Sequence, residues 1–143
     1  MMKILGIDYG RRRIGIAVTD ESGTCIKGRP TIDQKKHSDI YSVLASIIVT
    51  ESPDAIVIGV PLGPRDEETV MSKEIRKFAK KISKKIQPDI KIHFIDESFS
   101  SSKAHNQIVF KKKKQRQNKD IVNMYAACNI LESFQRLQQC GPL

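Results

Sequence analysis

Acidic residues stand at the ends of two apolar runs in the chain. Asp8 closes the first run and is followed by Gly10, and the pair Asp96 and Glu97 follows a later one. A carboxylate in apolar surroundings is costly unless it is paired or binds a metal ion. Carboxylate oxygens suit Mg²⁺, and two metal ions among carboxylates can hydrolyse a phosphodiester bond. We therefore interpret Asp8 and Glu97 as candidate metal ligands and Asp96 as a structural helix cap. A plain turn residue is the alternative for Asp8.

The hydrophobic pattern predicts the elements that must position these acids. Strands are expected at residues 3–9, 14–19, 24–32, 55–60 and 91–95, and helices at 38–51, 66–87, 98–110 and 120–138. The first two strands form a hairpin, whereas alternation with helices makes the first, fourth and fifth strands parallel. The prediction is an α/β fold with a mixed five-stranded sheet flanked by helices. Since sites in such sheets lie at the carboxyl ends of parallel strands, Asp8 and Glu97 should meet there.

Composition limits the class of protein and its partners. A length of 143 residues fits one domain, 1–143, and 25 Lys and Arg against 16 Asp and Glu give a net charge of +9. This excess predicts a polyanionic partner. The 3 cysteines form no CxxC pair, which argues against a disulfide scaffold or a structural zinc site. No apolar run approaches the roughly 18 residues of a membrane span, so we expect a cytoplasmic protein with no membrane partner.

The basic residues fall into three groups. Arg11, Arg12 and Arg13 follow Asp8 after Tyr9 and Gly10 and are expected to contact phosphates. The seven cations of residues 73–85 are interpreted as a solvated helix face, with a binding face as the alternative. The segment 111–119 has no apolar residue and is predicted to be a flexible loop that binds nucleic acid, because crowded cations gain only from a polyanion. Its basic residues are Lys111, Lys112, Lys113, Lys114, Arg116 and Lys119.

Four motifs together resemble a known family. They are ILGIDYGRRRIGIAVTD around Asp8, IGVPL at 58–62, DESFS at 96–100 and AACNILES at 126–133. In order and spacing they resemble the YqgF/RuvX family of bacterial RuvC-like nucleases. The resemblance implies a ribonuclease H-like fold and a hydrolase that cleaves phosphodiester bonds with Mg²⁺ or Mn²⁺. It also implies a substrate of structured RNA or branched DNA, either the 5′ end of pre-16S rRNA or a Holliday junction.

The family's acids transfer only in part. The first falls on Asp8 and the second on Glu97, and Arg13 matches a basic position, but Asn123 stands where the family has an aspartate. An Asn carbonyl coordinates Mg²⁺ more weakly than a carboxylate. Asp120, one helical turn earlier, is either a replacement ligand or only the cap of the last helix.

The sequence leaves two questions open: whether the protein cleaves its substrate, and whether it forms oligomers. Because Asn123 removes one charge from the site, a nucleic-acid-binding protein that has lost cleavage is the alternative to an enzyme. A junction resolvase is expected to act as a dimer, so a homo-oligomer is compatible with the sequence.

Overall fold

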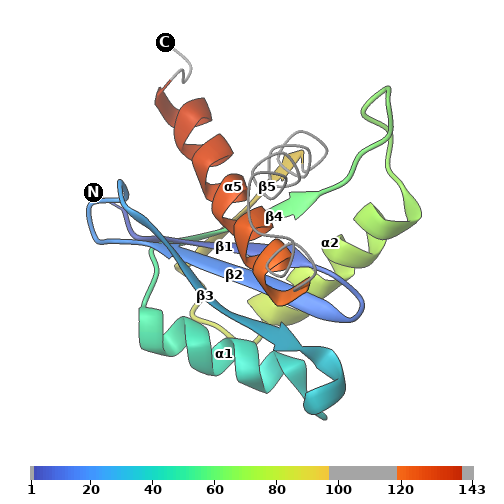
Figure 1. The fold of residues 1–143 in the computed structure, drawn as a ribbon, viewed down its shortest axis with the longest axis horizontal. Helices are drawn as coiled ribbons and strands as arrows, with labels where there is room; N and C mark the ends of the chain where they lie inside the picture. The colour runs from blue at the N-terminus through green and yellow to red at the C-terminus, as the bar shows by residue number, and fades with distance from the viewer. Residues whose placement is uncertain (1, 97–118, 140–143) are drawn as a thin grey trace.

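The computed structural model describes residues 2–96 and 119–139, and in them a five-stranded sheet of order β3-β2-β1-β4-β5 forms the centre of the molecule (Figure 1). β1 pairs antiparallel with β2, β2 pairs antiparallel with β3, and β4 is parallel to both β1 and β5. The predicted mixed sheet and its parallel strands are therefore confirmed. The strands are β1 Ile4–Tyr9, β2 Arg13–Thr19, β3 Ile26–Asp33, β4 Ala55–Val60 and β5 Lys91–Asp96.

Helices cover both faces of the sheet. They are α1 Ile40–Glu51, α2 Val70–Ser83 and α5 Lys119–Gln139, with a short 3₁₀ turn at Gln34–Lys36. Alternate residues of β1 separate the two layers: Leu5 and Ile7 pack with α1 and α2, whereas Ile4 packs with α5. α5 therefore crosses the opposite face from α1 and α2 (Figure 1).

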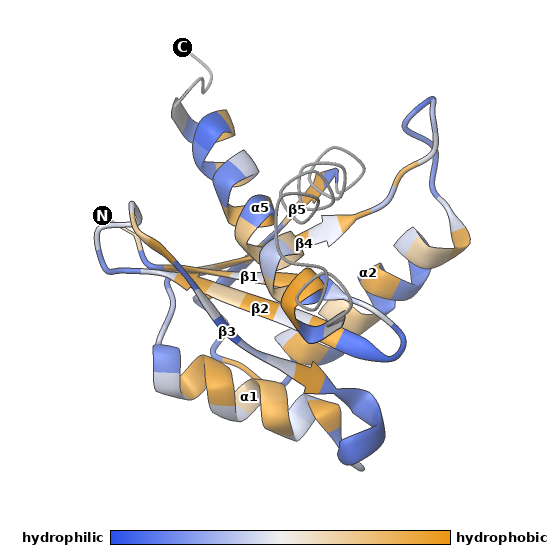
Figure 2. Cartoon of the chain, viewed as in Figure 1, coloured by the Kyte–Doolittle hydropathy of each residue, from blue (hydrophilic) through white to orange (hydrophobic). Residues whose placement is uncertain are grey.

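The hydropathy of the elements matches these layers. β4 is buried along its whole length, as expected for a central parallel strand covered on both faces. The turn between β1 and β2 is hydrophilic and projects from the sheet (Figure 2). The apolar interior therefore ends where the arginine-rich turn begins.

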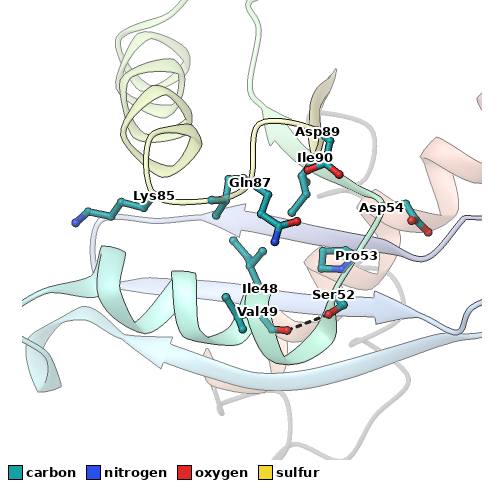
Figure 3. Close-up of a pocket in the computed structure, with 10 residues that line it drawn as sticks. Ile48, Val49, Ser52, Pro53, Asp54, Lys85, Gln87, Asp89 and Ile90 are labelled. Atoms are coloured by element: carbon teal, nitrogen blue, oxygen red, sulfur yellow. Dashed lines mark hydrogen bonds between the residues drawn. The ribbon is translucent and has the colours of Figure 1, made fainter.

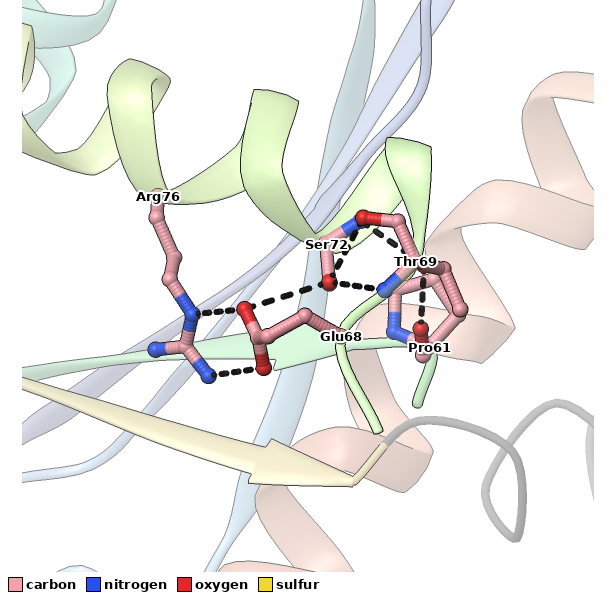
Figure 4. Close-up of polar contacts among 5 residues, drawn as sticks. All are labelled: Pro61, Glu68, Thr69, Ser72 and Arg76. Atoms are coloured by element: carbon pink, nitrogen blue, oxygen red, sulfur yellow. Dashed lines mark hydrogen bonds and ion pairs between the residues drawn. The ribbon is translucent and has the colours of Figure 1, made fainter. Parts of the chain in front are cut away.

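α2 begins later than the sequence pattern predicts. The helix was expected from residue 66 with acids in its first turn, but it starts at Val70 after the N-cap Thr69. The Thr69 hydroxyl accepts from the Ser72 amide, and the Ser72 hydroxyl accepts from the Thr69 amide (Figure 4). This capping box stops the helix there. Asp66 has φ 59°, in the left-handed region, so the helix prediction over 66–69 was wrong.

Some predictions concern the rest of the chain. The expected helix 98–110, the basic loop 111–119 and the ligand Glu97 lie outside the described residues, apart from the backbone of Lys119. The single-domain prediction for 1–143 stays a prediction. Within residues 2–96 and 119–139, no helix is both long and apolar enough to span a membrane.

Candidate functional site

The carboxyl ends of the three parallel strands lie side by side. Ile7 of β1 pairs with Ile58 of β4, and Val60 of β4 pairs with Asp96 of β5. The expected edge is therefore present, with Asp8 near the end of β1 and Asp96 at the end of β5. Asp96 closes β5 and is exposed.

Asp8 is a buried carboxylate beneath the start of α5. Asp8 has only 8% of its surface exposed. In the β1–β2 ladder it lies directly across from Gly15. A Cβ at Gly15 would lie 2.0 Å from the backbone oxygen of Asn123, so α5 rests on this glycine. Cross-strand neighbours share a face and lie about 5 Å apart. Asp8 and Asn123, which the sequence separates by more than a hundred residues, therefore come together on the α5 side of the sheet.

Asp120 anchors the first turn of α5 to the sheet. Its carboxylate Oδ1 lies 3.1 Å from Nε of Arg13, and its backbone oxygen accepts a 2.7 Å hydrogen bond from the Thr31 hydroxyl. Since α5 begins at Lys119, Asp120 lies within the first turn instead of at the cap position. A negative charge there also suits the helix dipole. Asp120, Asn123 and Asp8 are thus gathered around one helix start.

The other two arginines of the turn also have carboxylate partners. Arg11 Nε lies 3.1 Å from Glu74 of α2, and Arg12 Nε lies 2.8 Å from Asp33 at the end of β3. The hydrogen bond from Arg12 lowers the pKa of Asp33 to about 2. These ion pairs tie the β1–β2 turn to its neighbours. The expected phosphate contacts of Arg11, Arg12 and Arg13 stay a prediction, and sequence reasoning missed the partners because nothing in local spacing links them.

A shallow hollow opens beside this group. It has a volume of about 340 Å³ and is lined by Gly10, Arg12, Arg13, Val122 and Asn123. Two cationic side chains and the Asn123 amide therefore border an open surface next to Asp8. Such a surface admits a polymer backbone more readily than it encloses a small molecule.

A larger pocket lies at the opposite end of the sheet. It has a volume of about 510 Å³ between the end of α1 and the segment that follows α2 (Figure 3). Ser52, which lines it, donates a 3.0 Å hydrogen bond to the Val49 carbonyl oxygen. Because the chemistry-bearing residues lie at the other edge, we assign the site to the smaller hollow beside Asp8.

The donor set of the described residues fits a divalent cation only in part. Asp8, Asp120 and Asn123 offer the oxygen donors that Mg²⁺ and Mn²⁺ prefer. Within the described ranges, however, no three acidic, His or Cys residues are clustered as a metal site. The predicted second acid, Glu97, belongs to the part that is not described.

The fold defines the class of protein. The chain is similar to the Thermus thermophilus RuvC structure solved in complex with a Holliday junction substrate, with a TM-score of 0.63, 11% identity and coverage of 99% and 97% of the two chains. It is equally similar to the Fowlpox virus resolvase solved with Holliday junction DNA, with a TM-score of 0.63, 13% identity and coverage of 96% and 99%. This is the ribonuclease H-like fold of RuvC-type resolvases, as the sequence predicts.

The family follows from closer relatives. The model of the family described as "RuvX: Holliday junction resolvase" matches residues 2–136, so the chain belongs to this family. A protein of Nitratidesulfovibrio vulgaris is 36% identical over 133 residues, covering 93% of this chain and 92% of its own. One of Bacteroides fragilis is 35% identical over 136 residues, covering 94% and 96%. Both carry the name "Putative pre-16S rRNA nuclease".

Proposed function

We propose that the protein is a metal-dependent nuclease that hydrolyses phosphodiester bonds in structured nucleic acid, with pre-16S rRNA 5′-end processing as its main role. The observation that carries the proposal is the burial of Asp8 at the carboxyl edge of the sheet, under the first turn of α5. The names of the relatives support the RNA substrate. A cytoplasmic location would suit this role.

Each site residue has a distinct task in this proposal. Asp8 and Glu97 would hold Mg²⁺ or Mn²⁺, and Asp120 or Asn123 would complete the ligand set. The cation, when bound, would polarise the phosphodiester for attack by water. Burial of Asp8 keeps its carboxylate in a low-dielectric setting where a cation interacts strongly. Arg13, held at the rim by Asp120, would contact a substrate phosphate.

The basic segment 111–119 would add affinity without base recognition. Contacts from Lys111, Lys112, Lys113, Lys114, Arg116 and Lys119 would reach the phosphate backbone, which carries no sequence information. Arg11 and Arg12 would extend the same cationic surface from the β1–β2 turn.

A second candidate is resolution of Holliday junctions. The likeness in fold to two resolvases solved with junction DNA favours it. Symmetrical cleavage of a junction would require two copies of the chain, so this activity predicts a homo-oligomer. A third candidate is nucleic-acid binding without cleavage, which Asn123 favours because it supplies no negative charge.

A cleavage assay with both substrates separates the three candidates. Wild type, Asp8→Asn and the control Asp89→Asn are incubated with a pre-16S rRNA fragment or a four-way junction, in Mg²⁺, Mn²⁺ or EDTA. Asp89 is an exposed acid at the opposite end of the sheet. We expect metal-dependent cleavage that Asp8→Asn abolishes, with binding retained, and that Asp89→Asn leaves intact. Binding of either substrate with no cleavage in any metal would establish the non-catalytic alternative.

A further inference from the structure

A groove on the outer side of the molecule lies between α2 and β5. Arg76, Lys80 and Ser83 recur at helical spacing on one side, and Ile92 and Phe94 alternate on the other. Lys77 and Ala79 complete the lining of a space of about 400 Å³. Because β5 is an edge strand, the groove opens directly to the surface.

The groove wall on the α2 side is cationic. Arg76, Lys77 and Lys80 are exposed, and among the described residues neither Lys77 nor Lys80 forms an ion pair with a carboxylate. The helix thus divides its cations between two sides: Lys81 lies 5.6 Å from the ring centre of Tyr41 of α1, away from β5. The cations of α2 are therefore not one uniform solvated face.

The groove wall on the β5 side presents an aromatic ring. Phe94 keeps 39% of its surface exposed although it lies within a strand. The guanidinium of Arg76 lies 4.9 Å from the centre of this ring, and Glu68 fixes it with bonds of 2.6 and 3.0 Å (Figure 4). Arg76 and Phe94 together form a platform, a guanidinium held over an aromatic ring, whose position is set before any ligand binds.

The groove ends near the same edge of the sheet as the site, but on the other face. Phe94 lies two residues before Asp96, so about 7 Å of strand separate the platform from the carboxyl edge. Asp8 lies on the α5 side of the sheet and the groove on the α2 side, so a polymer in the groove would have to pass over the carboxyl edge to reach Asp8.

We propose that this groove binds a single-stranded segment of the nucleic acid substrate that continues over the carboxyl edge of the sheet to the site. An exposed aromatic ring stacks on an unpaired base, and lysines along the same groove contact its phosphates. A duplex keeps its bases paired and stacked, so it cannot use the platform. The inference rests on the proposed nuclease function and makes its substrate one with a single-stranded portion.

Binding in EDTA tests the groove without cleavage. A fluorescein-labelled single-stranded oligoribonucleotide and a blunt RNA duplex are titrated by anisotropy over a range of salt. Lys77→Gln with Lys80→Gln should lower the slope of log K against log salt for the single strand by about 1.4. The matched control is Lys81→Gln with Lys85→Gln, which removes one charge from α2 and one from the turn that follows it, both next to α1, and should leave the slope unchanged.

The aromatic platform is tested separately. Phe94→Ala should weaken single-strand binding roughly fivefold or more and leave duplex binding unchanged. Phe94→Leu keeps apolar packing and should weaken it similarly, because the ring does the stacking. Thermal unfolding verifies that the variants fold.

The outcomes separate this inference from the proposed function. The groove proposal would be overturned if the groove and control double variants had equal salt slopes for the single strand, or if Phe94→Leu kept full single-strand affinity. Failure of the proposed function would appear instead as the absence of any metal-dependent, Asp8-dependent cleavage. If cleavage depends on Asp8 but neither groove variant changes single-strand binding, the nuclease stands and the groove proposal falls.

Discussion

Gly15 is the position where one methyl group should disturb the whole site. In Gly15→Ala the new Cβ would lie 2.0 Å from the backbone oxygen of Asn123 and 2.6 Å from its carbonyl carbon. An ordinary contact is at least 3.4 Å, so the first turn of α5 must move by more than an ångström. Neither contact atom can rotate away, because both belong to the helix backbone.

The cost follows from overpacking. Forcing a methyl group into a packed region typically costs about 1–3 kcal/mol, and alanine regains about 0.4–1 kcal/mol by restricting the unfolded chain. We expect a net loss of about 1–2 kcal/mol in the free energy of unfolding. At this chain length that corresponds to a Tm lower by roughly 3–8 °C.

Activity should fall further than stability. Displacement of a site residue by about 1 Å can cost about a hundredfold in rate. Asn123 lies on Gly15, and Asp8 is the cross-strand neighbour of Gly15. At temperatures below its melting temperature, Gly15→Ala should therefore cleave about a hundredfold more slowly than wild type. Circular dichroism melts and a single-turnover cleavage assay measure the two effects.

Gly28→Ala is the matched control. Its new Cβ would meet the side chain of Met124, the next residue of α5, at 2.4 Å from the sulfur. A methionine side chain can change rotamer, so the control should lose less stability and keep most of its activity. A wild-type Tm and cleavage rate in Gly15→Ala would refute the argument that α5 is held against β2 at this point.

Three further variants test other parts of the structure. Asn123→Asp should raise metal-dependent cleavage severalfold if the third ligand limits it; unchanged activity would favour Asp120 as the working ligand or no catalysis. Thr69→Ala removes the N-cap of α2 and should lower the free energy of unfolding by about 1 kcal/mol in urea denaturation, with no loss if the cap is irrelevant. The pKa of Asp33 is lowered from 3.8 to about 2 by Arg12, so its stabilising contribution is present above pH 3.8 and is lost as the pH falls toward 2. In Arg12→Gln, carboxyl NMR titration should show the Asp33 pKa raised from about 2 toward 3.8, while the Lys35 amide and Arg13 still lower it, and an unchanged value would refute the assigned cause.

Much of the fold was predictable because the hydrophobic pattern of each segment agrees with the strand or helix that it forms. Short apolar runs defined the strands, and the spacing of Leu44 and Ile48 defined α1. The strand–helix alternation then fixed the parallel order of β1, β4 and β5. The start of α2 was not predictable from hydrophobic period alone, because the reciprocal bonds of Thr69 and Ser72 and the left-handed Asp66 decide it.

The sequence by itself determined which chemistry is available: Asp8 at a strand end, a turn of three arginines, and Asn123 in place of an acid. Only the tertiary structure decided their relations. Asp120 pairs with Arg13 across a sequence distance of 107 residues, and α5 approaches Asp8 because Gly15 has no side chain. Likewise, helical spacing showed that α2 is basic, but the packing of Tyr41 and Phe94 on its two sides decided which cations face the groove. The physical reason is that an ion pair or a close backbone approach depends on distance in space, which local periodicity does not encode.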